Sequence, residues 1–383
     1  VWRGDHNVMA FEVLNEVIIS RGAVVRPVQR ETHIDGGLLT TYVADGLIIA
    51  TGSSWPNLPL FPIDGTQIIT SKQALDLSKI PTSLLIVGGG VEGCEFASLY
   101  SGLGTQVTLV ELMPRLLPLE DEEISQMMER ELKKRGVDIR TGVTVDQIVR
   151  QPDLVTAHLR DGLSLNVEQV LVSVGRGFNS RGIGLEKAGI QVGTRGEIVV
   201  NDRMETNVPG VYAIGDVVGK AMLAHVASAQ GKVAVENFMG RPRTIDYDVI
   251  PTGIFTLPEI GRVGLTEQQA RDRCVAAGKD PQQSVKVGRF RYGGLGKAQA
   301  TGDIQGLLKV VADAESDRIL GVHILGAHAA DLVHEAALAM HLGATVSRVA
   351  EMIHAHPTLA EGLMEAMEDV HGHAIHLARK PSS

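Results

Sequence analysis

Three glycines and one glutamate have the spacing of a dinucleotide-binding loop. Gly88, Gly90 and Gly93 form a G-x-G-x-x-G pattern directly after an apolar run, and Glu111 follows at the end of the next apolar run. In such a loop the first glycine permits a tight turn, the second lets the backbone approach a pyrophosphate, and the third lets a helix pack on a strand. The N-terminus of that helix offers free N–H groups and a partial positive charge to the phosphates. The carboxylate of Glu111 suits a ribose 2′-hydroxyl and would repel a 2′-phosphate, so the pattern predicts NAD rather than NADP.

A histidine and a glutamate near the C-terminus have the spacing of an acid–base pair. His356 precedes Pro357, and Glu361 follows shortly after. A carboxylate bonded to one ring nitrogen would fix the tautomer and make the other nitrogen more basic. The alternative is structural, because Thr358 to Glu361 also fits a capping box at the start of a helix. Spacing alone favours the cap.

Two further strand ends carry small or polar residues. Thr51, Gly52 and Ser53 follow one apolar strand, and Gly215 and Asp216 follow another. Ligands bind at the carboxyl ends of strands in open α/β sheets. Asp216 suits either a ligand hydroxyl or the cap of a following helix, and the residues do not choose between them. Taken alone, residues 51–53 are typical of an ordinary turn.

Composition excludes several functional classes. The chain has 383 residues, a net charge of −9 and no block of lysine and arginine, which argues against nucleic acid. No apolar run reaches the length of a membrane span. Cys94 and Cys274 lie far apart, which predicts neither a disulfide framework nor a zinc site and favours a reducing cytoplasm. His371, His373 and His376 cluster in a polar tail without a convincing set of metal ligands, so no metal is predicted.

A βαβ unit must position the glycine loop. Apolar strands at 84–87 and 107–110 flank a helix of small residues, which is the arrangement of a parallel α/β sheet. An acid-first, base-last pattern over 118–136 predicts a surface helix. After residue 250 the pattern becomes α+β, with strands expected at 285–291, 307–312 and 320–325 and a helix at 329–342.

Eight segments then occur in one order: IIATGS, the glycine loop with Glu111, VGR, TNVPGVYAIGD, MLAH, FTLPEIGRVGLTE, RILGVHILG and HAHPTLAE. In that order the chain resembles the flavin-dependent pyridine nucleotide–disulfide oxidoreductases. Within that superfamily it most resembles the dihydrolipoamide dehydrogenases, the E3 components of 2-oxoacid dehydrogenase complexes. The resemblance runs from about residue 11 to residue 371.

The resemblance implies an α/β fold in which a Rossmann-like NAD domain is inserted in a truncated FAD domain and followed by an α+β dimerisation domain. The implied boundaries are 1–67 and 179–248 for the FAD-binding part, 68–178 for the NAD-binding domain and 249–383 for the interface domain. It further implies the cofactors FAD and NAD, a cytoplasmic homodimer, and lipoyl domains of 2-oxoacid dehydrogenase complexes as partners, with no nucleic acid or membrane.

The resemblance also assigns site residues. His356 corresponds to the catalytic base and Glu361 to the acid that orients it, completing the active site of the other subunit. The FAD site takes Thr51, Gly52, Ser53, Gly215, Asp216, Met222, Leu223, Ala224 and His225. The NAD site takes Gly88, Gly89, Gly90, Val91, Glu92, Gly93, Cys94, Glu95, Glu111, Val143 and Gly175.

The chain departs from the family pattern in two ways. Glu92 stands where the family usually has an aliphatic residue. The family's first G-x-G-x-x-G, for the FAD adenosine, and its C-x4-C redox pair are absent, and neither Cys94 nor Cys274 can replace that pair. We therefore expect an incomplete chain that is inactive alone. The alternatives are a related flavin NAD(P)H oxidoreductase of the transhydrogenase or NADH oxidase type, or a non-catalytic nucleotide-fold assembly subunit.

Overall fold

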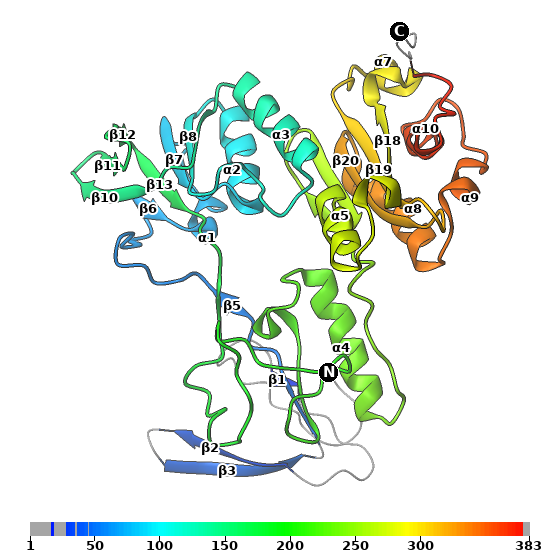
Figure 1. Ribbon diagram of the computed structural model, residues 1–383. Helices are drawn as coiled ribbons and strands as arrows, with labels where there is room; N and C mark the ends of the chain where they lie inside the picture. The colour runs from blue at the N-terminus through cyan, green and yellow to red at the C-terminus, as the bar shows by residue number, and fades with distance from the viewer. Residues whose placement is uncertain (1–16, 19–27, 35–36, 45, 378–383) are drawn as a thin grey trace. The chain divides into compact units, whose positions relative to one another are not determined.

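The computed structural model describes residues 17–18, 28–34, 37–44 and 46–377, with side chains from residue 46 onward. The chain forms two compact units (Figure 1). The first combines residues 1–56 with 176–246, and the second combines residues 57–175 with 247–383. Across the described ranges, every helix is too short or too polar to cross a membrane.

A five-stranded parallel sheet forms one part of the second unit. Its strand order is β6-β13-β7-β8-β9, with bounds Ile68–Ile69, Gln169–Val172, Ser83–Val87, Gln106–Glu111 and Asp138–Thr141. Leu84, Leu85 and Ile86 of β7 are fully buried, as a strand covered on both faces requires. An antiparallel sheet of β10 (Val145–Arg150), β11 (Val155–Leu159) and β12 (Ser164–Val167) precedes β13.

The register of β7 and β8 sets the position of the glycine loop. Val87 pairs with Val110 in parallel, so Gly88 and Glu111 leave the sheet side by side at its carboxyl edge. The helix α2 (Val91–Gly102) starts directly after its N-cap, Gly90. The expected βαβ unit is therefore present, with its polar residues at one edge.

Helix α3 (Glu122–Lys134) begins later than the acidic pattern predicts, with Asp121 as its N-cap. Asp121 and Glu120 are buried rather than exposed on a surface helix. Asp121 lies 2.8 Å from Lys309 Nζ, and Glu120 lies 2.9 Å from Arg262 Nε. The expectation of a purely surface helix is wrong at this end, because these acids meet cations from the following part of the unit.

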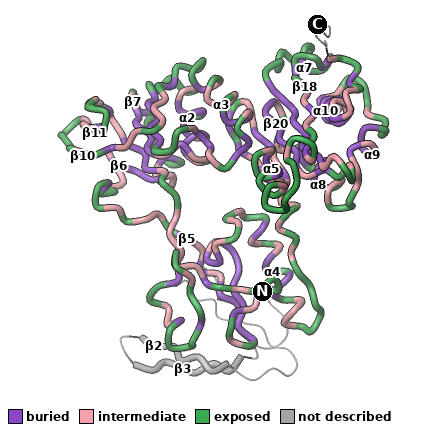
Figure 2. Tube along the Cα trace, in the orientation of Figure 1, coloured by how far each residue is buried: buried purple, intermediate pink, exposed green. Residues whose placement is uncertain are grey.

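An antiparallel five-stranded sheet forms the other part of the second unit. Its order is β16-β17-β20-β19-β18, with bounds Thr252–Ile254, Glu259–Gly264, Ile319–Gly326, Leu307–Asp313 and Val285–Arg291. Helix α8 (Ala329–His341) packs on β17 and β20, and α10 (Glu361–Val370) packs on β18 and β19. The buried residues of these strands are coloured purple along the trace in Figure 2. The predicted strands and helix of this region are all present. Its shorter helices are α5 (Glu267–Ala276), α6 (Pro281–Ser284), α7 (Gly296–Thr301) and α9 (Val346–Ala350).

The first unit is built on the parallel pair β4 (Leu47–Ile49) and β15 (Val211–Ala213), with β1 (Val17–Ile18) antiparallel to β4. A 3₁₀ turn, η1 (Gly215–Val218), and helix α4 (Ala224–Phe238) follow β15. The remaining strands are the hairpin β2 (Val28–Ile34) and β3 (Gly37–Ala44), and the short pair β5 (Ser53–Ser54) and β14 (Gly177–Phe178).

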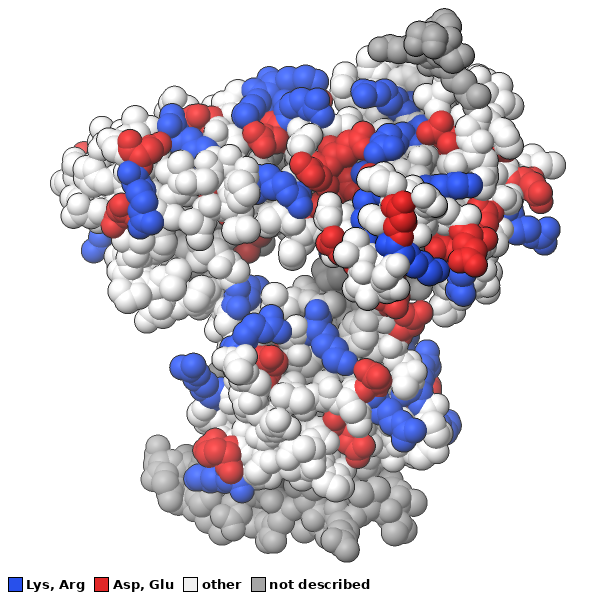
Figure 3. Space-filling model, in the orientation of Figure 1, with Lys and Arg blue, Asp and Glu red and all other residues white. Residues whose placement is uncertain are grey.

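On the face drawn in Figure 3, acidic and basic side chains of the described residues are interspersed.

Candidate active site and cofactor sites

The glycine loop has the geometry that its spacing predicts. Gly88 has a φ of 110°, and a Cβ on it would overlap the Ser173 carbonyl oxygen. A Cβ on Gly93 would overlap the Gly88 carbonyl oxygen. Gly90, in contrast, has no heavy atom within 4 Å of the position of a Cβ. The first and third glycines are therefore required by the protein's own packing, while the second leaves space where a pyrophosphate can approach the backbone.

Cys94 lies behind this loop rather than facing it. The side chain is fully buried, and its thiol donates to the Gly89 carbonyl oxygen at 3.4 Å. Burial raises the pKa of the Cys94 thiol, and nearby carboxylates raise it further. Cys94 therefore packs the loop as a neutral thiol, and Cys94 and Cys274 are both unpaired.

Two carboxylates stand on the first turns of α2, near the exposed Val91. One oxygen of Glu92 is buried and has no hydrogen-bond partner within the described part of the chain. Glu95 accepts a hydrogen bond from the Phe255 amide at 2.8 Å. Burial raises the pKa of Glu95, the Phe255 amide opposes this, and Glu92 raises it again. Glu92 therefore adds negative charge where a dinucleotide would bring its own.

Glu111 is hydrogen-bonded to the glycine loop. Its two oxygens accept hydrogen bonds from the amides of Gly89 at 2.6 Å and Met113 at 2.7 Å. Each carboxylate oxygen has a second lone pair, so a ribose hydroxyl can still be accepted. The amide of Val143 donates to the Glu111 carbonyl oxygen at 3.1 Å, which brings Val143 to the same edge. Gly175 follows β13 with a φ of 96°.

The guanidinium of Arg115 is engaged within the protein and does not offset the negative charge of a 2′-phosphate. It is half-buried and donates to the carbonyl oxygens of Leu117, Pro118 and Glu120 at 2.8–3.3 Å. It holds the loop that leads to α3, and the preference for NAD over NADP still follows from Glu111.

A second polar cluster lies in the first unit. Ser53 Oγ donates to Asp216 Oδ2 at 2.5 Å and accepts from Arg176 Nε at 2.6 Å. Arg176 also donates to the Ser53 carbonyl oxygen at 2.8 Å and stacks over the Trp55 ring at 4.7 Å. Asp216 lies in η1, whereas α4 has Leu223 as its N-cap. Asp216 therefore does not cap that helix, and its binding of a ligand hydroxyl stays a prediction.

Hydrogen bonds of backbone groups hold the rest of this cluster. Gly215 has a φ of 74°, and its amide donates to Gln230 Oε1 at 2.6 Å. The carbonyl oxygens of Thr51 and Gly52 accept hydrogen bonds from Asn179. At the start of α4, Ala224 and His225 are exposed, as is Met222 just before the helix, and Leu223 is half-buried.

His356 and Glu361 form a hydrogen-bonded pair. Nδ1 of His356 lies 2.8 Å from Glu361 Oε1, and the ring is 76% exposed. A carboxylate at Nδ1 assigns the proton to that nitrogen and leaves a lone pair on Nε2. Burial would raise the pKa of Glu361, but the Thr358 amide, the His356 ring and the His376 charge together lower it.

Glu361 also serves the helix. Its other oxygen accepts the Thr358 amide at 2.8 Å, one half of a capping box. The other half is replaced, because the Thr358 hydroxyl donates to the Ala355 carbonyl oxygen at 2.8 Å and α10 begins at Glu361 itself. The two interpretations of the sequence are therefore not exclusive. One carboxylate holds both the histidine and the start of the helix.

The sequence did not reveal the partners of the tail histidines. His371 Nε2 lies 3.0 Å from Asp317, and His376 Nδ1 lies 2.6 Å from Glu365. Each of these two histidines therefore has an acidic partner, and the residues described in the structure contain no group of three metal-ligating side chains. Arg176 was also missed as a site residue, although its place directly after Gly175 at a strand end was a usable signal.

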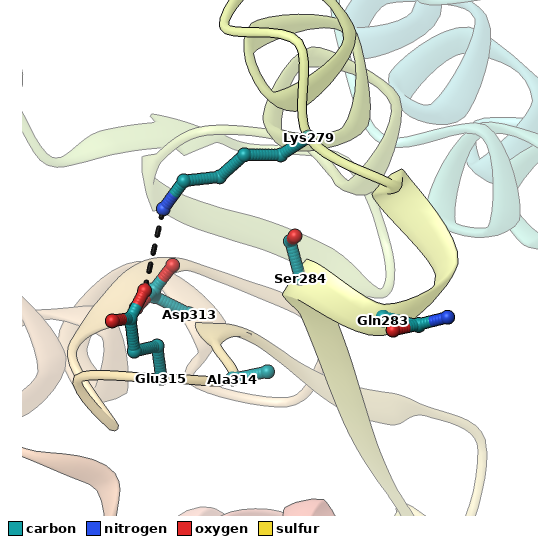
Figure 4. Close-up of a pocket in the computed structure, with 6 residues that line it drawn as sticks. All are labelled: Lys279, Gln283, Ser284, Asp313, Ala314 and Glu315. Carbon is teal, nitrogen blue, oxygen red and sulfur yellow. Dashed lines mark hydrogen bonds and ion pairs between the residues drawn. The ribbon is translucent and has the colours of Figure 1, made fainter.

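A separate hollow of about 250 Å³ lies between α6 and the β19–β20 turn (Figure 4). It is lined by Lys279, Gln283, Ser284, Asp313, Ala314 and Glu315. Lys279 lies across it, 3.4 Å from Glu315. The hollow contains this exposed ion pair but lacks the convergent polar groups of a catalytic site.

Comparisons with known proteins agree with this arrangement. The family description of pyridine nucleotide-disulphide oxidoreductases matches residues 11–231, and that family's dimerisation domain matches residues 250–367. The chain belongs to the pyridine nucleotide-disulphide oxidoreductase family.

The relatives within this family include several dihydrolipoyl dehydrogenases. That of Thermus scotoductus is 43% identical over 372 residues, which is 96% of this chain and 78% of the relative. That of Bacillus subtilis is 44% identical over 336 residues, 86% of this chain and 69% of the relative. Among solved structures, LpdA from Mycobacterium tuberculosis has a TM-score of 0.81 at 28% identity, covering 92% of this chain and 75% of LpdA. The Cu(II) complex of the flavoprotein disulfide reductase RclA from Escherichia coli has a TM-score of 0.79 at 27% identity, covering 89% of this chain and 76% of RclA.

Pyridine nucleotide-disulphide oxidoreductases use FAD and NAD. The residues of this chain fit both groups. The open space above Gly90 suits a dinucleotide pyrophosphate, and the Ser53–Asp216–Arg176 cluster offers a carboxylate and backbone groups to a flavin's hydroxyls. The dimerisation domain supports a homodimer.

Proposed function

We propose that the protein, in a form that carries a redox disulfide, acts as a dihydrolipoyl dehydrogenase, which oxidises dihydrolipoyl groups through that disulfide with NAD as the final acceptor. The observation that carries this is the His356–Glu361 pair, held at 2.8 Å with its ring exposed. It occurs in a chain whose relatives include dihydrolipoyl dehydrogenases at 43% and 44% identity. Transhydrogenase and NADH oxidase chemistry needs no thiol base, so this pair favours the thiol reaction.

In the proposed reaction, Nε2 of His356 takes the proton from a dihydrolipoyl thiol. The thiolate then attacks the enzyme disulfide, whose S–S bond breaks as a new mixed disulfide forms. The second substrate thiol then attacks the substrate sulfur of the mixed disulfide, so that this S–S bond breaks, the lipoyl disulfide forms and leaves, and the two enzyme sulfurs remain as a reduced pair. Glu361 keeps the proton on Nδ1 throughout, so that Nε2 is the nitrogen that accepts. When bound, FAD, which residues 51–53, Gly215, Asp216 and 222–225 would hold, would supply the electron acceptor for the enzyme dithiol, and NAD would supply the final hydride acceptor.

The other assignments of the site belong to this proposal. Gly88 to Glu95, Glu111, Val143 and Gly175 would bind NAD. Residues 51–53, Gly215, Asp216 and 222–225 would bind FAD. The partners would be a second copy of the chain and the lipoyl domains of 2-oxoacid dehydrogenase complexes, in a cytoplasmic setting. The four-part division at residues 67, 178 and 248 stays part of the proposal.

The two cysteines cannot supply the disulfide, because Cys94 is buried and both thiols are unpaired. We therefore expect this polypeptide alone not to reduce NAD with dihydrolipoamide. In a form of the protein that carries a redox disulfide, His356→Gln should lower dihydrolipoamide oxidation by about 10²- to 10⁴-fold, the usual contribution of a general base. Electron transfer from NADH to ferricyanide should change little in the same variant.

His341→Gln provides the matched control, because His341 is an exposed histidine at the end of α8. It should leave both activities intact. If His356→Gln spared dihydrolipoamide oxidation, or reduced the ferricyanide reaction equally, His356 would not be the thiol base and the proposed function would lose its main support.

A further inference from the structure

The segment that connects β8 to helix α3 is bonded directly to the glycine loop. We call it the strap (residues 111–121). Glu111, at its first position, accepts the Gly89 amide, and the Leu117 amide donates to the Gly89 carbonyl oxygen at 2.8 Å. The side chain of Leu116 lies 2.5 Å from the position that a Cβ on Gly89 would take. The strap therefore fixes both peptide groups of Gly89 and leaves no room for a larger residue there.

The middle of the strap is compact and strained. One guanidinium spans it, because Arg115 donates to the carbonyl oxygens of Leu117, Pro118 and Glu120 at 2.8–3.3 Å. Leu117 has a φ of 47°, a left-handed conformation that a leucine keeps only where its surroundings impose it. Leu116 and Leu117 are both fully buried. We therefore expect a displacement at one end of the strap to reach the other end rather than to be absorbed between them.

The far end of the strap meets a row of basic side chains on the antiparallel sheet. The register pairs Arg262 of β17 with His323 of β20, His323 with Lys309 of β19, and Lys309 with Arg289 of β18. Directly opposed residues of antiparallel strands share one face of the sheet. Helix α3, into which the strap leads, contacts β20 (Figure 1). The sheet thus presents three cations and a histidine to the end of the strap.

Two carboxylates attach the strap to this row. Glu120 Oε1 lies 2.9 Å from Arg262 Nε, and Asp121 Oδ1 accepts from Lys309 Nζ at 2.8 Å. Glu120 is 3% exposed, and its second oxygen has no hydrogen-bond partner within the described part of the chain. Burial raises the pKa of Glu120, and the charges of Arg262 and Arg115 oppose this. Arg262 therefore supplies the ion pair that compensates this buried carboxylate.

We propose that Arg262 is a positioning residue for NAD: through Glu120 it holds the strap, and through the strap it holds Gly89 and Glu111 in the conformation that binds the dinucleotide. The inference rests on the NAD site of the proposed function. It makes the affinity of the glycine loop depend on a side chain of the antiparallel sheet. If the ion pair served only to join the two sheets, its loss would lower stability and leave the affinity unchanged.

The test is calorimetric titration of the full chain with NADH and with ADP-ribose, the part of the dinucleotide that would lie at Gly89 and Glu111. Glu120→Met removes the carboxylate and keeps the length of the side chain. Because the strap loses its anchor, the affinity for both ligands should fall about three- to tenfold, within the usual range for coupling between separate sites. Direct electrostatics predicts the opposite sign, because removal of a negative charge favours an anionic ligand.

Arg262→Met should weaken binding by a similar factor, because it leaves the buried Glu120 without its ion pair. The conservative variants Arg262→Lys and Glu120→Gln keep a charge or an oxygen in the pair, so they should retain most of the affinity. Arg348→Gln is the matched control, because its ion pair with Glu351 spans 3.9 Å and is exposed on both sides. This control should bind both ligands like the wild type.

Hydrogen exchange measured on the same variants separates positioning from a loosened fold. In Glu120→Met, exchange should rise in the strap and the glycine loop, while β17 and β20 stay protected. Unchanged or tighter binding of NADH by Glu120→Met would overturn the inference, because the ion pair would then only join the two sheets. Faster exchange across the whole unit would also overturn it, because the lost affinity would then reflect general destabilisation.

Failure of the inference is distinct from failure of the proposed function. A wild-type chain that bound neither NADH nor ADP-ribose would remove the NAD site and the inference together. Wild-type binding with unchanged affinity in the variants would remove the inference alone. Weakened binding in Glu120→Met together with intact dihydrolipoamide oxidation in His356→Gln would leave the positioning role standing and remove the base role.

Discussion

Replacing Asp121 with asparagine would remove the negative charge nearest to the buried Lys309. Asp121 Oδ1 lies 2.8 Å from Lys309 Nζ, and the two side chains are 2% and 4% exposed. Asp121 also accepts the amides of Glu123 and Glu267, so it binds the starts of α3 and α5 together. Asparagine remains a good helix cap, but its amide group turns a donor toward these donors. The substitution therefore removes the negative charge and one hydrogen-bond acceptor while it keeps the helix cap.

The expected cost follows from what Lys309 retains. Removing one partner of a buried ion pair destabilises by about 3–5 kcal/mol. Lys309 still has Glu267 at 2.9 Å and Glu123 at 3.5 Å, so we expect the lower end, about 3 kcal/mol. In a unit of this size that corresponds to a fall in melting temperature of about 6 to 12 °C. Asp121→Ala should cost about 1 kcal/mol more, because the cap is lost as well.

Differential scanning calorimetry would measure this, with Glu315→Gln as the matched control. The Lys279–Glu315 pair at 3.4 Å is exposed on both sides, and its loss should cost about 0.5 kcal/mol or less. If Asp121→Asn melted within 1–2 °C of the wild type (roughly 0.5 kcal/mol), or if the control lost as much, the buried network would not stabilise the unit as argued.

The pH dependence gives a second check on the same variant. Burial opposes ionisation of Asp121, but His323 and Lys309 outweigh it and lower its pKa. A carboxyl with a lowered pKa in the folded state stabilises fully above its unfolded pKa of about 4, and this contribution is lost as pH falls through the folded pKa. The difference between the wild type and Asp121→Asn should therefore be full at pH 7 and shrink below about pH 4.

Three further substitutions and one reagent test the glycine loop and its surroundings. Gly93→Ala should abolish NADH binding and lower the melting temperature, because its Cβ would overlap the Gly88 carbonyl oxygen. Gly90→Ala has open space around its Cβ, so it should keep its stability and lose only NADH affinity. Equal melting temperatures of the two variants would contradict this. Glu92→Gln should tighten NADH binding by about two- to threefold in calorimetric titration. The gain should fade at high salt, because salt screens the repulsion, and weaker binding would count against the role given to its charge. Iodoacetamide followed by mass spectrometry should label Cys274 and not Cys94, since burial raises the pKa of the Cys94 thiol; labelling of both in the folded protein would show that the loop opens.

Local patterns predicted the parts of the fold that depend on short stretches of sequence. The apolar runs around residues 84–87 and 107–110 became β7 and β8, and the glycine spacing gave the tight turn and the close helix packing. The strands of the antiparallel sheet were recognised in the same way. These features are visible in a sequence because each is decided by neighbours only a few residues away.

The missed contacts depend on long-range pairing. Glu120 and Asp121 have the composition of an exposed helix start, and only their meeting with Arg262 and Lys309 makes them buried. The same holds for Arg176, whose partner Ser53 lies 123 residues earlier. The His376–Glu365 pair is closer in sequence, but it forms only because the chain reverses at Gly372. Charge patterns alone do not contain that information.

The position of Glu111 links cofactor preference to the shape of the glycine loop. Its carboxylate accepts the Gly89 amide, and in the proposed NAD site it would also accept a ribose hydroxyl. A redesign toward NADP would replace this acid with a neutral or basic residue, and the replacement would also release the amide that keeps the turn closed. Selectivity and loop geometry thus share one side chain in this protein. An engineered change of coenzyme would need a second substitution to provide a new acceptor for Gly89.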